Sequence, residues 1–448
     1  MQREIPQPPD PGILNALRFG SDPFRFLEAI QARFADLTEV PLPGRPPLVL
    51  VTNPSLAHDA LSRPGAFERV PTQGSAARIA ENGLVQSEGE LWRQQRRIVG
   101  SAFTGRRVIR YADTVGERAD ELAGEWATPD VDGEQRDLHR EMTALTIRVA
   151  AEVLLGERLG DDRPREFHDW MQAAGTEFEF SASTLKPGWL PDLSSGEFKR
   201  AAGGILELSE EIIERRRERL EREPDERGDM LALLLSAEDD PGVRYEENQI
   251  RDEVATFLIA GHETTALSLT YTLALLSWNP ECRKLVRAEA RAVLDGETPR
   301  HDHVSRLEYT DRVYREALRL YPPAWAVFRR AIEGTDLGEY SVEGGSAVIV
   351  PTWSIQRDGR YFERPEEFEP DRWERLNPDD YEPYLPFGSG PHKCVGRGFA
   401  LSGATLALAR LVHEFDVDVP EDALDDLSVS VTLRPKTGVP VTIRRADE

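Results

Sequence analysis

The sequence predicts a mainly α-helical protein with small β-sheets. Between about residues 55 and 320, apolar residues recur at helical spacing with charged residues between them. Alternating runs typical of strands occur near residues 40–55, 325–355 and 427–445. The chain has 448 residues, of which 40 % are hydrophobic, and this is enough to bury a large core.

The first elements are a strand pair and a series of helices. LPGRPPLVLVTNPS, residues 42–55, predicts two strands broken by glycine and proline. EEIIERRRERLERE, residues 210–223, predicts a charged helix that stops at the loop PDERGD (224–229), which is too short to establish a domain boundary. One long helix is expected from about Asn248 to Ser277, before Pro280. Its length would be roughly 45 Å, enough to span a small domain.

After Pro322 the pattern changes from helices to short strands and loops. SAVIVP, residues 346–351, predicts a strand, and a helix is expected after Cys394. The last strand-like run, LSVSVTLRPKTGVPVTIRR, alternates around Lys436-Thr437-Gly438. It therefore predicts a β-hairpin over residues 427–445 that turns at this glycine.

The composition is strongly acidic and excludes several classes of protein. There are 55 lysines and arginines against 80 aspartates and glutamates, for a net charge of −25. Such a chain repels nucleic acid and anionic membranes, and its lysine-poor, halophile-like composition suits a salty cytoplasm in which ions screen self-repulsion. No stretch approaches the ~20 apolar residues of a membrane span, and we expect no export signal at the polar N-terminus.

The two cysteines are expected to stay reduced in a cytoplasmic protein. Cys282 and Cys394 could form one disulfide, but a chain without an export signal favours free thiols. The absence of a CxxC pair removes the usual ligands of a structural zinc site. The sequence indicates no role for Cys282.

The stretch FGSGPHKCVGRGFA, residues 387–400, is the most informative. Glycines before Cys394 allow a tight loop, and a helix follows, whose N-terminus would stabilise a thiolate. Gly396 leaves room for a flat group against this helix. A lone cysteine would indicate only a buried thiol after a turn. The surrounding pattern, with Phe387 and His392, instead favours a thiolate ligand of haem iron.

The stretch YREALRLYPP, residues 314–323, places Glu316 and Arg319 on one helix face. Alone, such a pair would be an ordinary surface ion pair. Arg372, in the proline-restrained loop FEPDRW, could reach it. A glutamate held by two guanidinium groups would then form a satisfied buried network.

The stretch AGHETT, residues 260–265, lies in the middle of the long helix. Gly261 and its neighbouring threonines are poor helix formers, which suggests a helix opened to admit a small ligand and water. Glu263 and Thr264 could then relay protons, although a packing glycine would explain the motif alone. The zinc motif HExxH is excluded because residue 266 is alanine.

The stretch ELWRQQRRIVGSAF, residues 90–103, places Trp92 and Arg96 four residues apart on one helix face. Together they could donate hydrogen bonds to an anionic group. The alternative is a basic helix face that only meets water.

These four stretches resemble the cytochrome P450 family, in the family's order, from about residue 40 to the C-terminus. The resemblance implies one cytochrome P450 domain over residues 1–448, with haem b (iron protoporphyrin IX) between the long central helix and the cysteine-loop helix. It implies Cys394 as the proximal iron ligand, with Phe387 and Gly396 beside the haem. Glu263 and Thr264 match the acid–alcohol pair that delivers protons to dioxygen. The implied structural triad is Glu316, Arg319 and Arg372, and the implied haem-propionate partners are Trp92, Arg96, Arg329 and His392; Arg329 has Arg330 as a rival.

The implied reaction is that of a monooxygenase. One atom of O2 enters the substrate, and the other leaves as water after two electrons and two protons arrive. The electrons would come from a separate donor, a ferredoxin with its reductase, and a basic patch around His392, Lys393 and Arg397 would bind an acidic donor. Residues 167–193 lie where the family closes its pocket, and their aromatic residues fit either an apolar small-molecule substrate or the core.

Other functions fit the sequence less well. A peroxygenase or haem isomerase would not need Glu263 and Thr264, and a haem sensor would need a signalling domain. A penicillin-recognising serine hydrolase would use three short motifs. These occur in order as Ser183-Thr184-Leu185-Lys186, Ser277-Trp278-Asn279 and Lys436-Thr437-Gly438.

Overall fold

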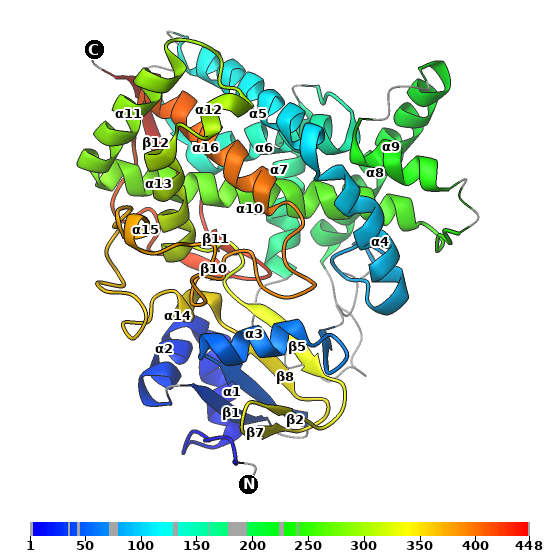
Figure 1. The fold of residues 1–448 in the computed structure, drawn as a ribbon, viewed down its shortest axis with the longest axis vertical. Helices are drawn as coiled ribbons and strands as arrows, with labels where there is room; N and C mark the ends of the chain where they lie inside the picture. The colour runs from blue at the N-terminus through cyan, green and yellow to red at the C-terminus, as the bar shows by residue number, and fades with distance from the viewer. Residues whose placement is uncertain are drawn as a thin grey trace.

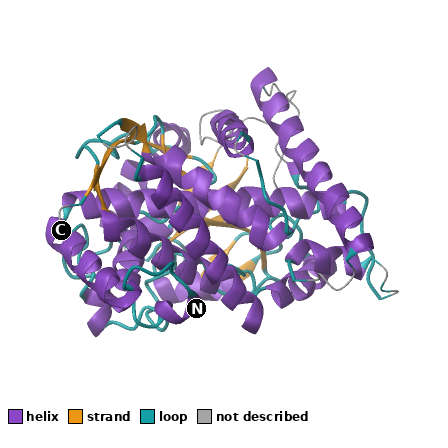
Figure 2. Ribbon diagram, turned by 90° about the horizontal axis from the view of Figure 1, so that it is seen from above, coloured by secondary structure: helices purple, strands orange, loops and turns teal. Residues whose placement is uncertain are grey.

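The protein is mainly helical, as the sequence predicts. The computed structural model describes residues 3–34, 36–42, 45–70, 79–128, 133–160, 162–177, 195–223, 228–238, 240 and 242–446. Helices account for 55 % of it. Figure 1 shows most helices in one large body, with a strand-rich region near the N-terminus beside it. Seen from above, helices dominate and strands gather in a few places (Figure 2).

The central helix is α10 (Gln249–Trp278), whose 30 residues agree with the predicted long helix. It ends where Pro280 begins α11 (Pro280–Leu294), because proline favours the first turn of a helix. The expectation of a helix opened at the AGHETT stretch is wrong, since α10 is helical throughout. The hydroxyls of Thr264 and Thr265 instead donate back to the carbonyls one turn earlier, at 3.0 and 3.2 Å.

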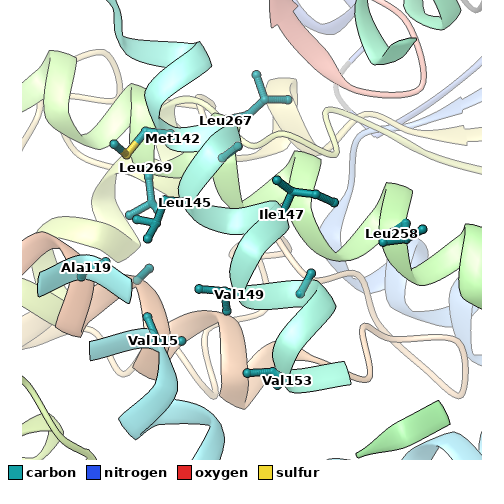
Figure 3. Packing of buried hydrophobic residues seen from close by; sticks show 14 of the residues in the cluster. Val115, Ala119, Met142, Leu145, Ile147, Val149, Val153, Leu258, Leu267 and Leu269 are labelled. Atoms are coloured by element: carbon teal, nitrogen blue, oxygen red, sulfur yellow. The ribbon is translucent and has the colours of Figure 1, made fainter. Parts of the chain in front are cut away.

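The main hydrophobic core surrounds α10. Helix α10 packs against α6 (Leu138–Leu155), while α5 (Gly105–Trp126) packs against α16 (Arg397–Glu414). Figure 3 shows the side chains that join these layers: Leu145 of α6 lies near Leu269 of α10, and Val149 of α6 faces Val115 of α5. Each fully buried aliphatic side chain contributes about 1.5–3 kcal/mol, so this core fixes α10 firmly.

The largest sheet has the strand order β1-β2-β8-β5-β3. Its N-terminal pair agrees with the predicted strand pair but begins earlier, at Leu37. Strand β3 contains only three residues, yet its antiparallel register with β5 bears directly on the site described below. The strands are β1 (Leu37–Leu42), β2 (Arg45–Val51), β3 (Phe67–Arg69), β5 (Val327–Ala331) and β8 (Ala347–Val350).

The prediction of one hairpin over residues 427–445 that turns at Gly438 is wrong. Strand β10 (Leu427–Val429) pairs with β11 (Leu433–Pro435), so the chain turns at residues 430–432. The following strand, β12 (Pro440–Arg445), joins a different sheet, between β4 (Gln135–Asp137) and β9 (Phe415–Asp418). Gly438 lies against Asp137, and a Cβ there would come within 2.3 Å of the carboxylate. This glycine therefore serves a crossing between sheets and not a hairpin turn.

The remaining elements complete the helical body and the small sheets. The predicted charged helix forms the end of α8, and residues 224–227 of its predicted loop lie outside the described residues. None of the helices in the described ranges is long and apolar enough to cross a membrane. The helices are α1 (Gly12–Ser21), α2 (Pro23–Arg33), α3 (Pro54–Ser62), α4 (Gly89–Ala102), α7 (Arg163–Glu177), α8 (Gly196–Arg222), α9 (Met230–Ala237), α12 (His301–Val304), α13 (Glu308–Leu320), α14 (Thr352–Ile355) and α15 (Arg372–Arg375); the strands are β6 (Thr335–Leu337) and β7 (Tyr340–Val342).

Candidate active site

A tight loop before α16 positions Cys394. Gly388 and Gly390 have φ angles of +67° and +69°, which L side chains rarely adopt. A Cβ at Gly390 would also lie 2.2 Å from the carbonyl oxygen of Leu61. The loop closes where the Cys394 backbone N–H donates to the carbonyl of Phe387 at 3.0 Å. The predicted glycine turn thus brings Phe387 and Cys394 together.

Opposing effects act on the pKa of the Cys394 thiol. The residue is exposed, yet enough protein surrounds the sulfur for desolvation to raise its pKa. The backbone N–H of Gly396 and the guanidinium groups of Arg96 and Arg397 oppose this rise. The expected stabilisation of the thiolate at the start of α16 is therefore present but smaller than the cost of desolvation. A metal cation bound to sulfur would reverse the balance, because a coordinating thiol is deprotonated.

Trp92 and His392 meet next to this loop. Their rings lie edge to face, with centroids 4.2 Å apart. The Nε2 atom of His392 is buried and has no hydrogen-bond partner among the described residues; the nearest carboxylate oxygen, on Glu88, lies 3.6 Å away. Burial and three nearby arginines lower the pKa of His392 to about 3. The imidazole is therefore neutral at physiological pH, and its Nε2 atom is available to a ligand.

Those three arginines converge on the same place. Arg69 of β3 and Arg329 of β5 occupy directly opposite positions on antiparallel strands, and Arg96 lies nearby on α4. Like charges placed opposite each other destabilise a sheet. At the next pair of opposite positions the charges are complementary, since Arg330 forms an ion pair with Glu68. This contact distinguishes Arg329, which joins the cationic cluster, from Arg330, which does not.

The cluster carries an excess of positive charge. Arg69, Arg96 and Arg329 face one carboxylate, that of Glu88, which leaves about two positive charges. Burial lowers the pKa of Arg69 to about 10, and the nearby Arg329 and Arg96 add a smaller lowering, which Glu88 opposes. An anion with two charges would relieve this repulsion. Sequence reasoning missed Arg69, because only the pairing of a three-residue strand reveals it.

Glu316, Arg319 and Arg372 form one buried network. The Glu316 carboxylate accepts from Arg319 at 2.8 and 3.0 Å and from Arg372 at 2.9 Å. The side chains of the glutamate and Arg319 are 0 % exposed. The remaining guanidinium groups donate to backbone carbonyls, including that of Gln356 at 2.9 Å. The structure thus brings together the three residues whose spacing suggests a satisfied network, on α13 and α15.

Glu263 and Thr264 lie in the middle of α10 but do not bond to each other. Thr264 is half-buried and Ala260 is exposed, although the turns on either side are buried, so this helix face borders a space. The Thr264 hydroxyl donates to the Ala260 carbonyl. The Glu263 carboxylate instead accepts from Thr432 at 2.9 Å and from Arg434. Sequence reasoning missed these two partners, because it placed both in a hairpin with the wrong turn.

The described residues of the alternative serine-hydrolase motifs contact separate partners and do not form one site. Ser277 exchanges hydrogen bonds with the backbone of Val419, and Lys436 forms an ion pair with Asp426 at 2.5 Å. The third motif, at residues 183–186, lies outside the described residues, as does most of the predicted pocket segment 167–193. Nothing in the described ranges gathers these groups into a nucleophilic site.

Comparison with known proteins identifies the family to which the chain belongs. A family model described as Cytochrome P450 matches residues 6–440. Cyclooctatin synthase of Streptomyces melanosporofaciens is 34 % identical over 402 residues, which cover 89 % of this chain and 86 % of that protein. Cyclooctat-9-en-7-ol 5-monooxygenase of the same organism is 32 % identical, covering 88 % and 84 %. Pentalenene oxygenase of Streptomyces avermitilis is 29 % identical, covering 92 % and 91 %.

Proposed function

Because the chain belongs to the cytochrome P450 family and is therefore a haem-thiolate monooxygenase, we propose that Cys394 is its iron ligand. The loop that presents this thiol carries the proposal, since Cys394 lies near Arg96 of the cationic cluster and at the start of α16. We also propose that residues 1–448 act as one domain, with the haem between α10 and α16.

The residues present fit haem b. Its two propionate groups carry two negative charges, which match the excess of the Arg69, Arg96 and Arg329 cluster. The unpartnered Nε2 of His392 offers a further hydrogen bond, and Trp92 lies against this ring. A Cβ at Gly396 would meet only the Phe103 ring, at 3.7 Å, so the loop leaves space beside the thiol. Among these, Arg69 is the partner that we add to the predicted set.

The mechanism then follows from what each residue can do. When bound, the haem supplies the chemistry of O2 activation with two electrons. Cys394 donates a thiolate, and the Gly396 N–H tempers its charge through a hydrogen bond. Thr264 presents a hydroxyl on the exposed face of α10, where it can hold a proton or a water molecule. Glu263, one residue earlier, can bring protons to that hydroxyl after it releases one of its own partners.

The triad is given a structural role in this proposal. Glu316, Arg319 and Arg372 are buried and mutually satisfied, so they have no free group to offer a substrate. They join α13 to the start of α15. A buried carboxylate between two arginines holds its geometry because removing any partner strands a charge.

We propose an apolar cyclic substrate of the terpenoid class. Two of the similar proteins carry names that specify an alkene alcohol, cyclooctat-9-en-7-ol, and an alkene, pentalenene. Such skeletons offer little beyond apolar surface, and they suit a space bordered by the exposed Ala260 of α10. A screen of cyclic terpenes and terpene alcohols against fatty acids and steroids, read from the substrate-induced change of the haem spectrum, tests this class.

We further propose that a ferredoxin and its reductase supply electrons in the cytoplasm. A reducing compartment keeps the Cys394 thiol free for iron. The chain is acidic overall. Of the predicted basic patch, Lys393 is exposed, whereas Arg397 forms an ion pair with Asp379 and His392 is neutral. Exposed Arg97 lies on α4, whose Trp92 contacts His392. Such a local basic patch would steer an acidic electron donor to the thiolate side.

Carbon monoxide added to the reduced, haem-loaded protein tests the ligand assignment. We expect a strongly red-shifted Soret band that persists in the control Cys282→Ser and disappears in Cys394→His, because only thiolate ligation produces it. The histidine variant should still bind haem. An unchanged spectrum in Cys394→His would contradict the assignment.

A further inference from the structure

Arg434 lies where three elements meet. It belongs to β11, but its Nη2 atom donates to the Glu263 carboxylate of α10 and lies 3.3 Å from the Thr432 hydroxyl. Its Nη1 atom donates to the carbonyl of Met171, on α7, at 3.1 Å. One guanidinium group therefore links a carboxylate in the middle of α10 to the backbone of another helix.

This contact is buried and has room only because of a glycine. The side chains of Arg434 and Glu263 are 9 % and 8 % exposed. A Cβ at Gly175 of α7 would lie 1.8 Å from the Nη1 atom of Arg434. The Nη1 atom is held by its hydrogen bond to the Met171 carbonyl and cannot move aside freely. A methyl group at position 175 would therefore displace the guanidinium. Gly175 therefore permits the contact with α7.

The hairpin that carries Arg434 is fixed to α10. The hydroxyl of Tyr271, which lies farther along α10 than Glu263, donates to the Leu433 carbonyl at 2.7 Å. The Thr432 hydroxyl also donates to Glu263 at 2.9 Å. Because the hairpin formed by β10 and β11 is bonded to α10 at two points, the bond to Met171 is the part of the contact that depends on where α7 lies.

Among the residues that the structure describes, the groups nearest Arg434, apart from Glu263, are neutral. Three histidines face it: His139 of α6, His168 of α7 and His262 of α10. Burial lowers the pKa of all three, to about 3 for His262, so they are neutral at physiological pH. The rings of His139 and His168 lie edge to face with centroids 5.4 Å apart. Asp137 and Arg140 lie farther out, near His168.

We propose that Arg434 is a positioning residue for proton delivery: it fixes the acid Glu263 and couples it, through the Met171 carbonyl, to the position of α7. This inference rests on the proposed role of Glu263. With both bonds in place, Glu263 is directed to β11 and away from Thr264. Arg434 therefore restrains the Glu263 carboxylate, and a change at α7, whose Met171 carbonyl also holds the guanidinium, alters how readily the carboxylate is released.

The test measures how the haem-loaded protein divides O2 between two products. With NADPH, a ferredoxin and its reductase, and without substrate, O2 takes two electrons and two protons to give H2O2, or four of each to give two water molecules. The ratio of H2O2 formed to O2 consumed therefore reports proton delivery. It is measured between about pH 6 and pH 9, in H2O and in D2O.

Arg434→Gln should lower the H2O2 share several-fold and change its pH profile, because the guanidinium no longer holds the Glu263 carboxylate away from Thr264. Arg434→Lys should restore most of the wild-type division, because it keeps the charge. Gly175→Ala, which changes only α7, should act in the same direction as Arg434→Gln. The matched control is Gly203→Ala on α8, where a Cβ meets nothing within 4 Å.

Two results separate this inference from the proposed function. If Glu263→Gln itself divides O2 as the wild type does, the assignment of Glu263 as the acid is wrong, and the role of Arg434 falls with it. If Glu263→Gln is impaired but Arg434→Gln and Gly175→Ala keep the wild-type ratio and pH profile, Arg434 is structural only. Should Arg434→Gln fail to fold, Gly175→Ala decides, because it leaves every charge in place.

Discussion

Glu253 gives the sharpest test of how burial tunes this protein. It lies on α10 with 0 % exposure, and one carboxyl oxygen accepts from the Leu84 N–H at 3.1 Å. The other oxygen has no partner among the described residues. Desolvation, with a smaller contribution from Asp252, raises the pKa of Glu253 from 4.5 to about 8. The carboxyl is therefore protonated in the folded protein at neutral pH.

The sign and size of the effect follow from proton linkage. Between pH 4.5 and pH 8 the unfolded chain has lost this proton while the folded protein retains it. The contribution of Glu253 to the free energy of unfolding is therefore fully present below pH 4.5. It is lost as the pH rises to about 8, at about 1.4 kcal/mol per pH unit. From pH 5 to pH 7 the loss is about 2.5 kcal/mol. Glu253→Gln keeps the shape and the acceptor for Leu84 but cannot ionise, so it should escape this loss.

The assay is urea unfolding of the haem-loaded wild type and variant at a series of pH values. The difference in unfolding free energy should grow in favour of Glu253→Gln by about 2.5 kcal/mol from pH 5 to pH 7. Glu247→Gln, an exposed position near the start of the same helix, is the control and should show no such trend. Curves for wild type and Glu253→Gln that stay parallel over this range would refute the reasoning.

Three further predictions concern the site and the surface. Thr264→Ala should divert electrons to H2O2 and lower the product formed per NADPH; fully coupled turnover would remove Thr264 from the mechanism. Glu316→Ala should cost about 3–5 kcal/mol and lose haem, because it strands two buried guanidinium groups; normal haem content would contradict the triad. The unfolding temperature should rise between about 0.1 and 1 M NaCl, where screening shortens from about 10 to 3 Å and relieves the net charge of −25; a constant temperature would argue against self-repulsion.

Local patterns explain what could be predicted from the sequence. The long helix was recognisable because its spacing and the stop at Pro280 are both local signals. The Glu316 and Arg319 pair was likewise visible from spacing within one turn. The Cys394 loop depends on glycines whose positive φ angles are a local requirement. Each of these features needs only a few consecutive residues to form.

Long-range pairing explains what could not be predicted. Arg69 belongs to a strand of three residues, and only its register against β5 places it opposite Arg329. Arg434 follows a turn at residues 430–432, whereas the alternation in the sequence continues smoothly to residue 445. Period-two patterns do not state which strand is the partner, and β12 joined β4 and β9 instead. The missed residues are therefore those whose neighbours come from distant segments.

The balance of buried charges separates structural from ligand-binding groups in this protein. Glu316 is matched by two arginines that also bond to backbone carbonyls, so nothing there awaits a ligand. Glu263 is matched by Arg434, a pair that has to loosen for the acid to work. The cluster of Arg69, Arg96 and Arg329 has only one carboxylate facing it. In the proposed function, the two propionate groups of the haem would offset the cost of placing these cations together. The same motif residues are thus assigned to different roles by their surroundings and not by their spacing.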